Sequence, residues 1–390
     1  MDIEKKRKIC FVITSKIHYA RNKLILEKLH EHTNVELQIV LGASALLERF
    51  GKVEDDLVRD GFTVTDRVSM LLEGSTPYIM AKSTGIGIME FSSVFERIKP
   101  DIVIVRGDRY EMLAPATAAA YMNISIAHIE GGDTTGSIDE SVRHAITKLS
   151  HIHFATNDIS AGRIRSMGEN PDYVFNVGSP ELEVVASNDF KVTKEYVHSI
   201  GVGDIIDLDK PYIIVMQHSV TSEYAEAQLQ IEETLKAVKK MSLPTIWFWP
   251  NVDAGSDLIS KRIRQFREST ELHTVRFVKY LPQDQFYGLL KNARCLIGNS
   301  SAGLKECALL GVPVVNIGNR QGVRHAGKNV IAVSYKEEEI IKGVTTQLEH
   351  GQYEPDEFYH VPNTSLKIVS ILTEIPLYYQ KTFYEQDTKN

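Results

Sequence analysis

Short apolar runs rich in β-branched residues alternate with longer stretches of helical periodicity, and this alternation constrains the fold more than any other feature of the chain. In the first half the runs occupy residues 8–14, 35–41, 101–105, 124–129, 152–155 and 173–177, and residues 21–32 place Leu24, Ile25 and Leu29 at helical spacing. Near-continuous apolar strands, each followed by a helix, are typical of parallel sheets covered on both faces. The pattern therefore predicts an α/β fold with doubly wound parallel sheets.

The alternation stops once and then begins again, which indicates two domains. Residues 187–210 are polar and contain the segment GVGDIIDLDK, and predicted strands resume at 211–216, 245–249, 274–278, 295–298 and 312–318. A chain of 390 residues is also longer than one ordinary core requires. We predict a Rossmann-type N-terminal domain over residues 1–186, a Rossmann-type C-terminal domain over 187–364, and a helix from residue 365 that Pro376 ends.

Composition excludes some classes of protein. The net charge of −7 argues against non-specific binding of nucleic acid, which requires a basic face. Cys10, Cys295 and Cys307 form no CxxC pair and lie in apolar or helical contexts, so we expect buried thiols and a reducing cytoplasm. The apolar run after the basic N-terminus is too short for a signal sequence, and no stretch approaches the roughly 18 apolar residues of a membrane span.

Polar residues that directly follow the predicted strands are the candidates for chemistry, because ligands of open parallel sheets bind outside the carboxyl ends of the strands. In the first half, Asp108 and Glu130 follow two strands and Asp139 starts a predicted helix. Partial burial should raise the pKa of Glu130 towards acid–base work. Asp139 could also cap its helix, and Arg109 could position Asp108 or hold a phosphate.

The second half repeats this arrangement. His218 follows the first strand, and that place favours a role in the site over that of a core histidine. The string GNSSAG follows a later strand and opens a helix, where small residues and free backbone N–H groups can cradle a phosphate. Glu306, one turn further on, could accept hydrogen bonds from ribose hydroxyls. The residues predicted in this way to bind substrate or nucleotide are Arg109, Arg143, His144, Asn251, Asp253, Gly298, Ser300, Ser301, Glu306 and Arg320.

Metal-ligand motifs are not visible in the sequence. No HExxH motif and no set of Cys and His residues has ligand spacing. His151 and His153 alternate along the start of a predicted strand, a pattern that more often reflects packing. We therefore predict a reaction that needs no metal and no other cofactor.

Six strings in the order RGDR, HIEGGDTTGSIDESVRHAITKLSH, QHSVT, PNVDAGSD, GNSSAGLKE and GNRQG give the chain a resemblance to the hydrolysing UDP-N-acetylglucosamine 2-epimerases of sialic-acid-type sugar synthesis. The resemblance runs through both halves to about residue 324. It implies a GT-B-like fold with the nucleotide-sugar in an interdomain cleft and residues 365–390 packed back on the first domain. It also implies a homodimer whose catalytic carboxylates match Asp108, Glu130 and Asp139, and whose nucleotide and sugar-phosphate positions match His218, Ser300, Ser301, Glu306 and Arg320. We expect His218 to take part in catalysis as well.

One segment departs from the family pattern. Where the family usually shows Arg-Ala-Asp-Tyr-Ser-Lys after the first strand, this chain has Lys-Ile-His-Tyr-Ala-Arg from Lys16 to Arg21. Lys16 and Arg21 keep positive charges that suit a diphosphate. His18 replaces the acidic residue, which leaves a 2,4-diacetamido-trideoxy sugar on UDP or GDP open as the substrate.

The reaction that the resemblance implies converts UDP-N-acetylglucosamine and water to N-acetylmannosamine and UDP, by anti elimination to a glycal followed by hydration. The same reaction on a diacetamido sugar and a non-hydrolysing 2-epimerisation are the nearest alternatives. A GT-B glycosyltransferase would use the same nucleotide site but is disfavoured by the carboxylates of the first half. A non-catalytic nucleotide-sugar sensor is disfavoured because the chain retains all three carboxylates, Asp108, Glu130 and Asp139.

Overall fold

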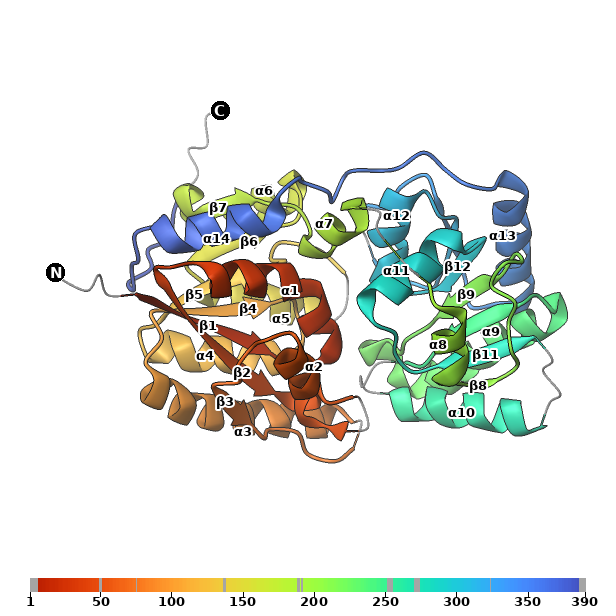
Figure 1. The fold of residues 1–390 in the computed structure, drawn as a ribbon, viewed down its shortest axis with the longest axis horizontal. Coiled ribbons are helices and arrows are strands. Elements are labelled where there is room, and N and C mark those ends of the chain that lie inside the picture. The colour runs from red at the N-terminus through yellow and green to blue at the C-terminus, as the bar shows by residue number, and fades with distance from the viewer. Residues whose placement is uncertain are drawn as a thin grey trace.

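The computed structural model describes residues 6–48, 51–74, 76–135, 138–187, 190, 192–250, 255–269, 274–322 and 324–385. Within these residues the chain forms two seven-stranded sheets that lie side by side, each covered by helices (Figure 1). None of the helices formed by these residues is both long and apolar enough to cross a lipid bilayer.

The first sheet has the strand order β3-β2-β1-β4-β5-β6-β7, and each pair of neighbours is parallel. Its strands are β1 (Arg7–Ile13), β2 (Val35–Gly42), β3 (Asp66–Val68), β4 (Ile102–Arg106), β5 (Ser125–Ile129), β6 (Ile152–Ala155) and β7 (Val174–Asn176). The helices between and after them are α1 (Lys16–Glu31), α2 (Val53–Arg59), α3 (Pro77–Ile98), α4 (Tyr110–Tyr121), α5 (Ile138–Leu149), α6 (Asp158–Ser166) and α7 (Pro180–Ser187).

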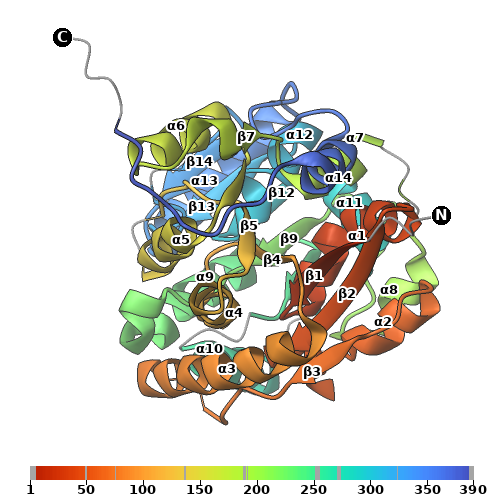
Figure 2. The same cartoon turned by 90° about the vertical axis from the view of Figure 1, so that its left-hand side faces the viewer.

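Alternate residues of the first sheet build two apolar cores, one on each face. In β1, Phe11 faces the helices α1, α2 and α14 (Thr364–Glu374), whereas Val12 faces α3, α4 and α5. Figure 2 shows the sheet between these helices. Burial on both faces explains why the strands read as continuous apolar runs rather than as an alternation of apolar and polar residues.

The second sheet has the order β14-β13-β12-β9-β10-β11-β8. Its strands are β8 (Gly201–Gly203), β9 (Ile213–Met216), β10 (Thr245–Phe248), β11 (Val275–Val278), β12 (Cys295–Gly298), β13 (Val314–Ile317) and β14 (Val330–Val333), and its helices are α8 (Lys194–Ser199), α9 (Ala227–Met241), α10 (Ser256–Ser269), α11 (Gln283–Asn292), α12 (Glu306–Leu310) and α13 (Glu337–His350). In both sheets the strand order reverses, as it does in Rossmann-type sheets. The reversal lies between β1 and β4 in the first sheet and between β9 and β12 in the second. The predicted fold class is confirmed.

Three short strands lie outside the predicted set, and one of them makes the second sheet mixed rather than wholly parallel. β8 pairs antiparallel with β11 at its edge. The buried side chain of Arg276 in β11 holds this segment, because its guanidinium donates to the carbonyl oxygens of Val197, His198, Gly201, Gly203 and Asp204. Backbone pairing with β11 and the hydrogen bonds of one arginine therefore hold the edge strand, which is not an apolar run.

The chain returns to the first sheet at its C-terminal end. After α13 the chain crosses from the second sheet to the first, and α14 packs against α1 and α7 (Figure 1). Ile368, Val369 and Leu372 of α14 are buried in the same core as α1. The predicted boundary between residues 186 and 187 stays a prediction; it falls at the last residue of α7.

Candidate active site

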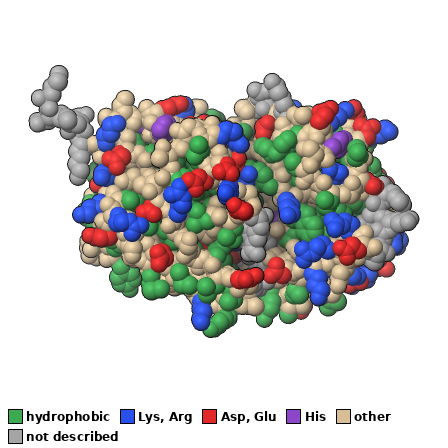
Figure 3. All heavy atoms as spheres, turned by 60° about the horizontal axis from the view of Figure 1, so that its bottom comes forward, with side chains coloured by type: hydrophobic (Ala, Val, Ile, Leu, Met, Phe, Trp, Pro, Cys, Tyr) green, Lys and Arg blue, Asp and Glu red, His purple; other side chains and the backbone are tan. Residues whose placement is uncertain are grey.

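In each sheet, polar residues follow the strands between which the strand order reverses. The residues of one sheet face those of the other, and ion pairs join the two sets. Figure 3 shows charged side chains of both signs on either side of the place where the two halves meet. Contacts across this junction include Arg21 with Glu306 and Arg324 with Asp108, at 3.0 and 3.8 Å. The carboxyl ends of both sheets therefore contribute to one site, as expected for this topology.

Glu130 lies directly after β5 and is 9% exposed, with a backbone φ of +75° in the left-handed region. Its Oε2 accepts from Arg106 Nε at 2.9 Å. Its Oε1 forms a short contact with the Nζ of Lys305, which belongs to the second half of the chain. A non-glycine residue in this backbone region is held there by its surroundings, and such residues concentrate at functional sites.

The predicted upward shift of the pKa of Glu130 is wrong. Burial raises that pKa, but the positive charges of Lys305, Arg106 and Arg21 outweigh burial and hold it well below its usual range. Glu130 is therefore an ionised carboxylate at neutral pH, which suits a proton acceptor better than a proton donor.

Asp108, in the loop after β4, is held by cations from two directions. Arg143 of α5 forms a short ion pair with it and also donates to the Asp133 carbonyl oxygen at 2.8 Å. Burial raises the pKa of Asp108, but the positive charges of Arg143 and Arg324 outweigh burial and bring that pKa below its ordinary value. Arg109, which we expected to position this carboxylate or a phosphate, donates to Glu111 from both Nε and an NH₂ group at 2.9–3.2 Å.

Three further predicted residues of the first half, Asp139, Arg143 and His144, lie on α5. Asp139 occupies the first turn of this helix rather than its N-cap, and Arg143 is four residues further on, on the same helix face. A carboxylate in the first turn is favoured by the helix dipole. His144 is partly exposed, and its Nε2 lies 3.8 Å from Glu140.

His218, directly after β9, is fixed through its backbone. Its N–H donates to the Asn299 side-chain oxygen and its carbonyl oxygen accepts from the Asn299 amide, both at 2.8 Å. Arg320, after β13, donates to the Asn299 carbonyl oxygen at 3.1 Å. Asn299 therefore joins the loops after β9, β12 and β13 into one wall of the site.

The string GNSSAG adopts a different structure from the predicted helix start. Ser301–Gly303 forms a 3₁₀ turn, which the Ser300 hydroxyl caps by accepting from the Ala302 N–H at 3.3 Å, and α12 begins only at Glu306. Gly298 has φ +133°, and a Cβ there would lie 2.1 Å from the Met216 carbonyl oxygen of β9. The glycine is therefore required by the neighbouring strand, whatever its relation to a ligand.

The segment that departs from the family pattern is occupied by internal contacts. Lys16 pairs with Asp56 at 2.8 Å and lies 4.4 Å from the centre of the Tyr280 ring. His18 is hydrogen bonded to the Thr14 hydroxyl at 2.9 Å. Burial, together with Arg106 and Arg109, lowers the pKa of His18 to about 3, so its ring is neutral at neutral pH. Asn251 and Asp253 lie outside the described residues.

Four charged residues of this region were not among those predicted. Arg106 and Glu181 are fully buried and contact each other, Lys305 contacts Glu130, and Arg324 lies 3.6 Å from Asp133. The rule that picked out Asp108 could have found Glu181, since it follows β7 closely. The same rule also points to Arg106, which directly follows the predicted strand 101–105 although the structure makes it the last residue of β4. Lys305 could not be found in this way because it precedes a helix rather than following a strand.

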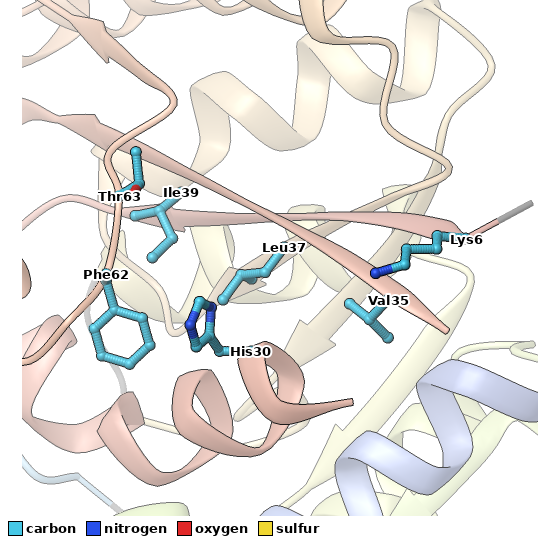
Figure 4. Close-up of a pocket in the computed structure, with 7 residues that line it drawn as sticks. All are labelled: Lys6, His30, Val35, Leu37, Ile39, Phe62 and Thr63. Carbon is cyan, nitrogen blue, oxygen red and sulfur yellow. The ribbon is translucent and has the colours of Figure 1, made fainter. Parts of the chain in front are cut away.

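A cavity of about 320 Å³ lies on the first sheet but is not part of this site. It is lined by Lys6, His30, Val35, Leu37, Ile39, Phe62 and Thr63 (Figure 4). Lys6 precedes β1 and Val35 is the first residue of β2, so the cavity lies towards the amino ends of these strands, away from the ends where ligands of such sheets bind.

Comparison with solved structures establishes the class of fold. The chain superposes on the UDP-GlcNAc 2-epimerase from Neisseria meningitidis bound to UDP-GlcNAc with a TM-score of 0.74 and 18% identity, covering 94% of this chain and 99% of that one. The UDP-GlcNAc 2-epimerase from Methanocaldococcus jannaschii gives a TM-score of 0.75, 19% identity, and 94% and 99% coverage. Two Rossmann-type domains arranged as in these proteins define a GT-B-like fold.

Comparison of sequences establishes the family. The family model described as UDP-N-acetylglucosamine 2-epimerase matches residues 27–373. A UDP-N,N'-diacetylbacillosamine 2-epimerase (hydrolyzing) from Legionella pneumophila is 32% identical over 96% of this chain and 97% of its own length. A UDP-N-acetylglucosamine 2-epimerase from Neisseria meningitidis is 30% identical over 92% of each. The chain belongs to the UDP-N-acetylglucosamine 2-epimerase family.

Proposed function

We propose that this protein is a hydrolysing 2-epimerase that converts UDP-N-acetylglucosamine and water to N-acetylmannosamine and UDP. The observation that carries the proposal is the buried Glu130 at the carboxyl end of β5, which Arg106 and Lys305 hold at the same junction where Arg324 reaches Asp108. The word "hydrolyzing" in the names of the Legionella pneumophila relative and of a Campylobacter jejuni relative, 30% identical over 84% of this chain, supports release of the nucleotide.

The chemistry explains why several carboxylates are needed. The hydrogen on C2 of the sugar is not acidic, because no carbonyl group lies next to it. We propose that the anomeric C–O bond breaks first, with positive charge developing at C1 and the electron pair leaving on the diphosphate. Glu130 then accepts the C2 proton, which gives a glycal. Water adds its hydroxyl group to C1. A second carboxylate, Asp108 or Asp139, takes the proton that this water releases and passes it to the opposite face of C2, and Glu130 gives its proton to the solvent.

The second domain has the groups needed for the leaving nucleotide. Arg320 would stabilise the charge that develops on the diphosphate, together with His218 and the backbone around Ser300 and Ser301. One oxygen of Glu306 is buried without a hydrogen-bond partner among the described residues, which suits a ribose hydroxyl group.

The first experiment is incubation of the protein with UDP-N-acetylglucosamine, without metal or acceptor, with the products followed by NMR. Equal amounts of UDP and N-acetylmannosamine are expected. UDP-N-acetylmannosamine with no free UDP would mean that the protein is a non-hydrolysing epimerase, and transfer of sugar only to an added acceptor would mean a glycosyltransferase.

Glu130→Gln tests the assigned base. We expect kcat to fall by about 10²–10⁴-fold, the usual contribution of one general base, because the amide cannot accept the C2 proton. UDP affinity, measured by calorimetry, should stay within a few-fold of that of the unchanged protein. Near-normal turnover in this variant would remove Glu130 from the mechanism.

A diacetamido-trideoxy sugar linked to UDP is the second candidate substrate. Two observations favour it: the similarity to the Legionella pneumophila enzyme named for that sugar, and the neutral His18 where the family pattern has an acidic residue. The ratio of kcat/KM for the two UDP-sugars decides between them. A ratio above about 10 in favour of either sugar corresponds to roughly 1.4 kcal/mol of discrimination in the transition state.

We also propose that the protein is a homodimer, as the family resemblance implies. Light scattering after gel filtration measures this directly, with about twice the chain mass of 43.9 kDa expected. A mass equal to that of one chain would contradict this proposal and leave the reaction proposed above unaffected.

A further inference from the structure

Six charged side chains, of which Arg21 is partly buried and the other five are buried, form one continuous group across the junction of the two domains. Arg21, Arg106, Glu130 and Glu181 come from the first domain, and Lys305 and Glu306 from the second. Three positive and three negative charges balance, as a buried group of this size requires. We call this group the junction network.

Lys305 is the member that reaches Glu130 from the other domain. It lies just before α12 and is 1% exposed. Its Nζ contacts Glu130 Oε1, lies 3.2 Å from the Ser179 hydroxyl oxygen and 3.7 Å from Glu181 Oε1. The other oxygen of Glu130 is held by Arg106, so the two cations fix both oxygens of the carboxylate.

We propose that Lys305 is a positioning residue for the reaction, a cation that the second domain supplies so that Glu130 is held ionised and correctly oriented when the two domains are in contact. The inference rests on the proposed function, in which Glu130 accepts the C2 proton. It deepens that function because it makes the state of the base in one domain depend on a residue of the other.

The electrostatics agree with this geometry. Among the charges that lower the pKa of Glu130, Lys305 contributes most, followed by Arg106 and Arg21. Other titratable or charged groups also act on Glu130: Arg143 favours its ionised form, Asp108 and Glu181 oppose it, and His18 and Tyr359 are neutral at neutral pH. Loss of Lys305 therefore leaves Glu130 easier to protonate.

Lys305→Met tests the proposal, since it removes the charge and keeps a chain of similar length. We expect kcat at neutral pH to fall at least 10-fold with KM within about 3-fold, because the interaction acts on the chemical step rather than on substrate binding. The acidic limb of the kcat–pH profile should move to higher pH. Lys305→Arg should bring that limb back, and Lys240→Met, which removes an exposed lysine of α9, should leave the profile unchanged.

Protonation of Glu130 can also be measured without turnover. The difference between the infrared spectra of each protein and its own Glu130→Gln version isolates the carboxyl band of Glu130 during a pH titration. We expect that band to appear at higher pH in Lys305→Met. If the protein hydrolyses no nucleotide-sugar and the band still moves, the proposed function fails and the link between Lys305 and Glu130 stands.

A lower kcat with an unmoved acidic limb and an unmoved carboxyl band would overturn the proposal, because Lys305 would then be only structural. Since Lys305→Met leaves Glu130 and Glu181 with one cation fewer, the variant could fail to fold. The comparison of Glu181→Gln with Lys305→Met/Glu181→Gln avoids this problem, because the double variant restores the balance of charge. Relative to Glu181→Gln, we expect the double variant to move both the acidic limb of the kcat–pH profile and the carboxyl band of Glu130 to higher pH. If neither moves, the proposed role of Lys305 is wrong.

Discussion

At the scale of single residues, backbone geometry at the strand ends fixes the positions of the polar side chains. Glu130 has φ +75° directly after β5, and Gly298 has φ +133° at the end of β12. Both conformations lie outside the regions that most residues prefer. The site thus rests on a few sharp turns held by close contacts with neighbouring strands.

Gly298→Ala should destabilise the second domain, because a Cβ would meet the Met216 carbonyl oxygen at 2.1 Å in a backbone conformation that disfavours side chains. We expect a loss of at least about 2 kcal/mol, seen as a lower urea midpoint for that domain. Gly162→Ala is the matched control, since a Cβ there meets nothing within 4 Å and alanine favours the helix α6. An unchanged midpoint for Gly298→Ala would show that the loop relaxes without cost.

The sequence pointed to several residues that the structure brings together, but not to their partners. Asp108 and Glu130 could be found because each follows an apolar strand. The partners that set their charge, Arg143 and Lys305, come from an element far along the chain in each case, and no periodicity links such pairs. The error in the pKa of Glu130 has this cause: burial can be inferred from the strand, whereas three cations from separate elements cannot.

At the scale of elements, apolar runs identified the central strands of both sheets and missed three strands at the sheet edges, β3, β8 and β14. β8 has the sequence Gly-Val-Gly, which carries no strand signal; it pairs with β11, and Arg276 binds the carbonyl groups around it. α1 begins at Lys16, earlier than the periodicity of residues 21–32 suggests. The hydroxyl of Ser15 accepts from the His18 N–H and caps an additional turn.

Leu372→Ala should weaken the first domain although the residue lies near the end of the chain. Leu372 of α14 is fully buried in the core shared with α1, and removing such a side chain costs about 2–5 kcal/mol. Hydrogen exchange followed by mass spectrometry should show faster exchange in β1 and β2. Leu366→Ala, at a position 50% exposed, is the control. Faster exchange confined to α14 would mean that this helix adds little to the core.

At the scale of the whole molecule, buried ionisable groups make stability depend on pH. Burial raises the pKa of Glu169 and of Glu181, but hydrogen bonds and nearby cations outweigh it and bring each pKa to about 2. Burial lowers the pKa of His128 to about 3 and that of His151 to about 4. In the unfolded chain these carboxylates and imidazoles bind protons near pH 4.3 and 6.5, respectively.

The carboxylates and the imidazoles change the stability with pH in the same direction, because in acid the unfolded chain binds more protons than the folded protein at both kinds of group. The free energy of unfolding should therefore fall from about pH 6.5 downwards, most steeply below about pH 4.5. Urea unfolding at a series of pH values measures this. Glu169→Gln should reduce the steepness below about pH 4.5, and Glu349→Gln, at an exposed site, should not. Equal steepness in all three proteins would refute the contribution of Glu169.

The return of α14 to the first domain also has a consequence for synthesis of the chain on the ribosome. The last strand of the first sheet ends at Asn176, and α14 begins at Thr364, about 190 residues later. At about 5–20 residues per second, translation takes roughly 10–40 s to cover that distance. Throughout this interval the nascent first domain lacks the helix that covers α1. Its apolar face stays open to chaperones, and a prematurely terminated chain would keep it open.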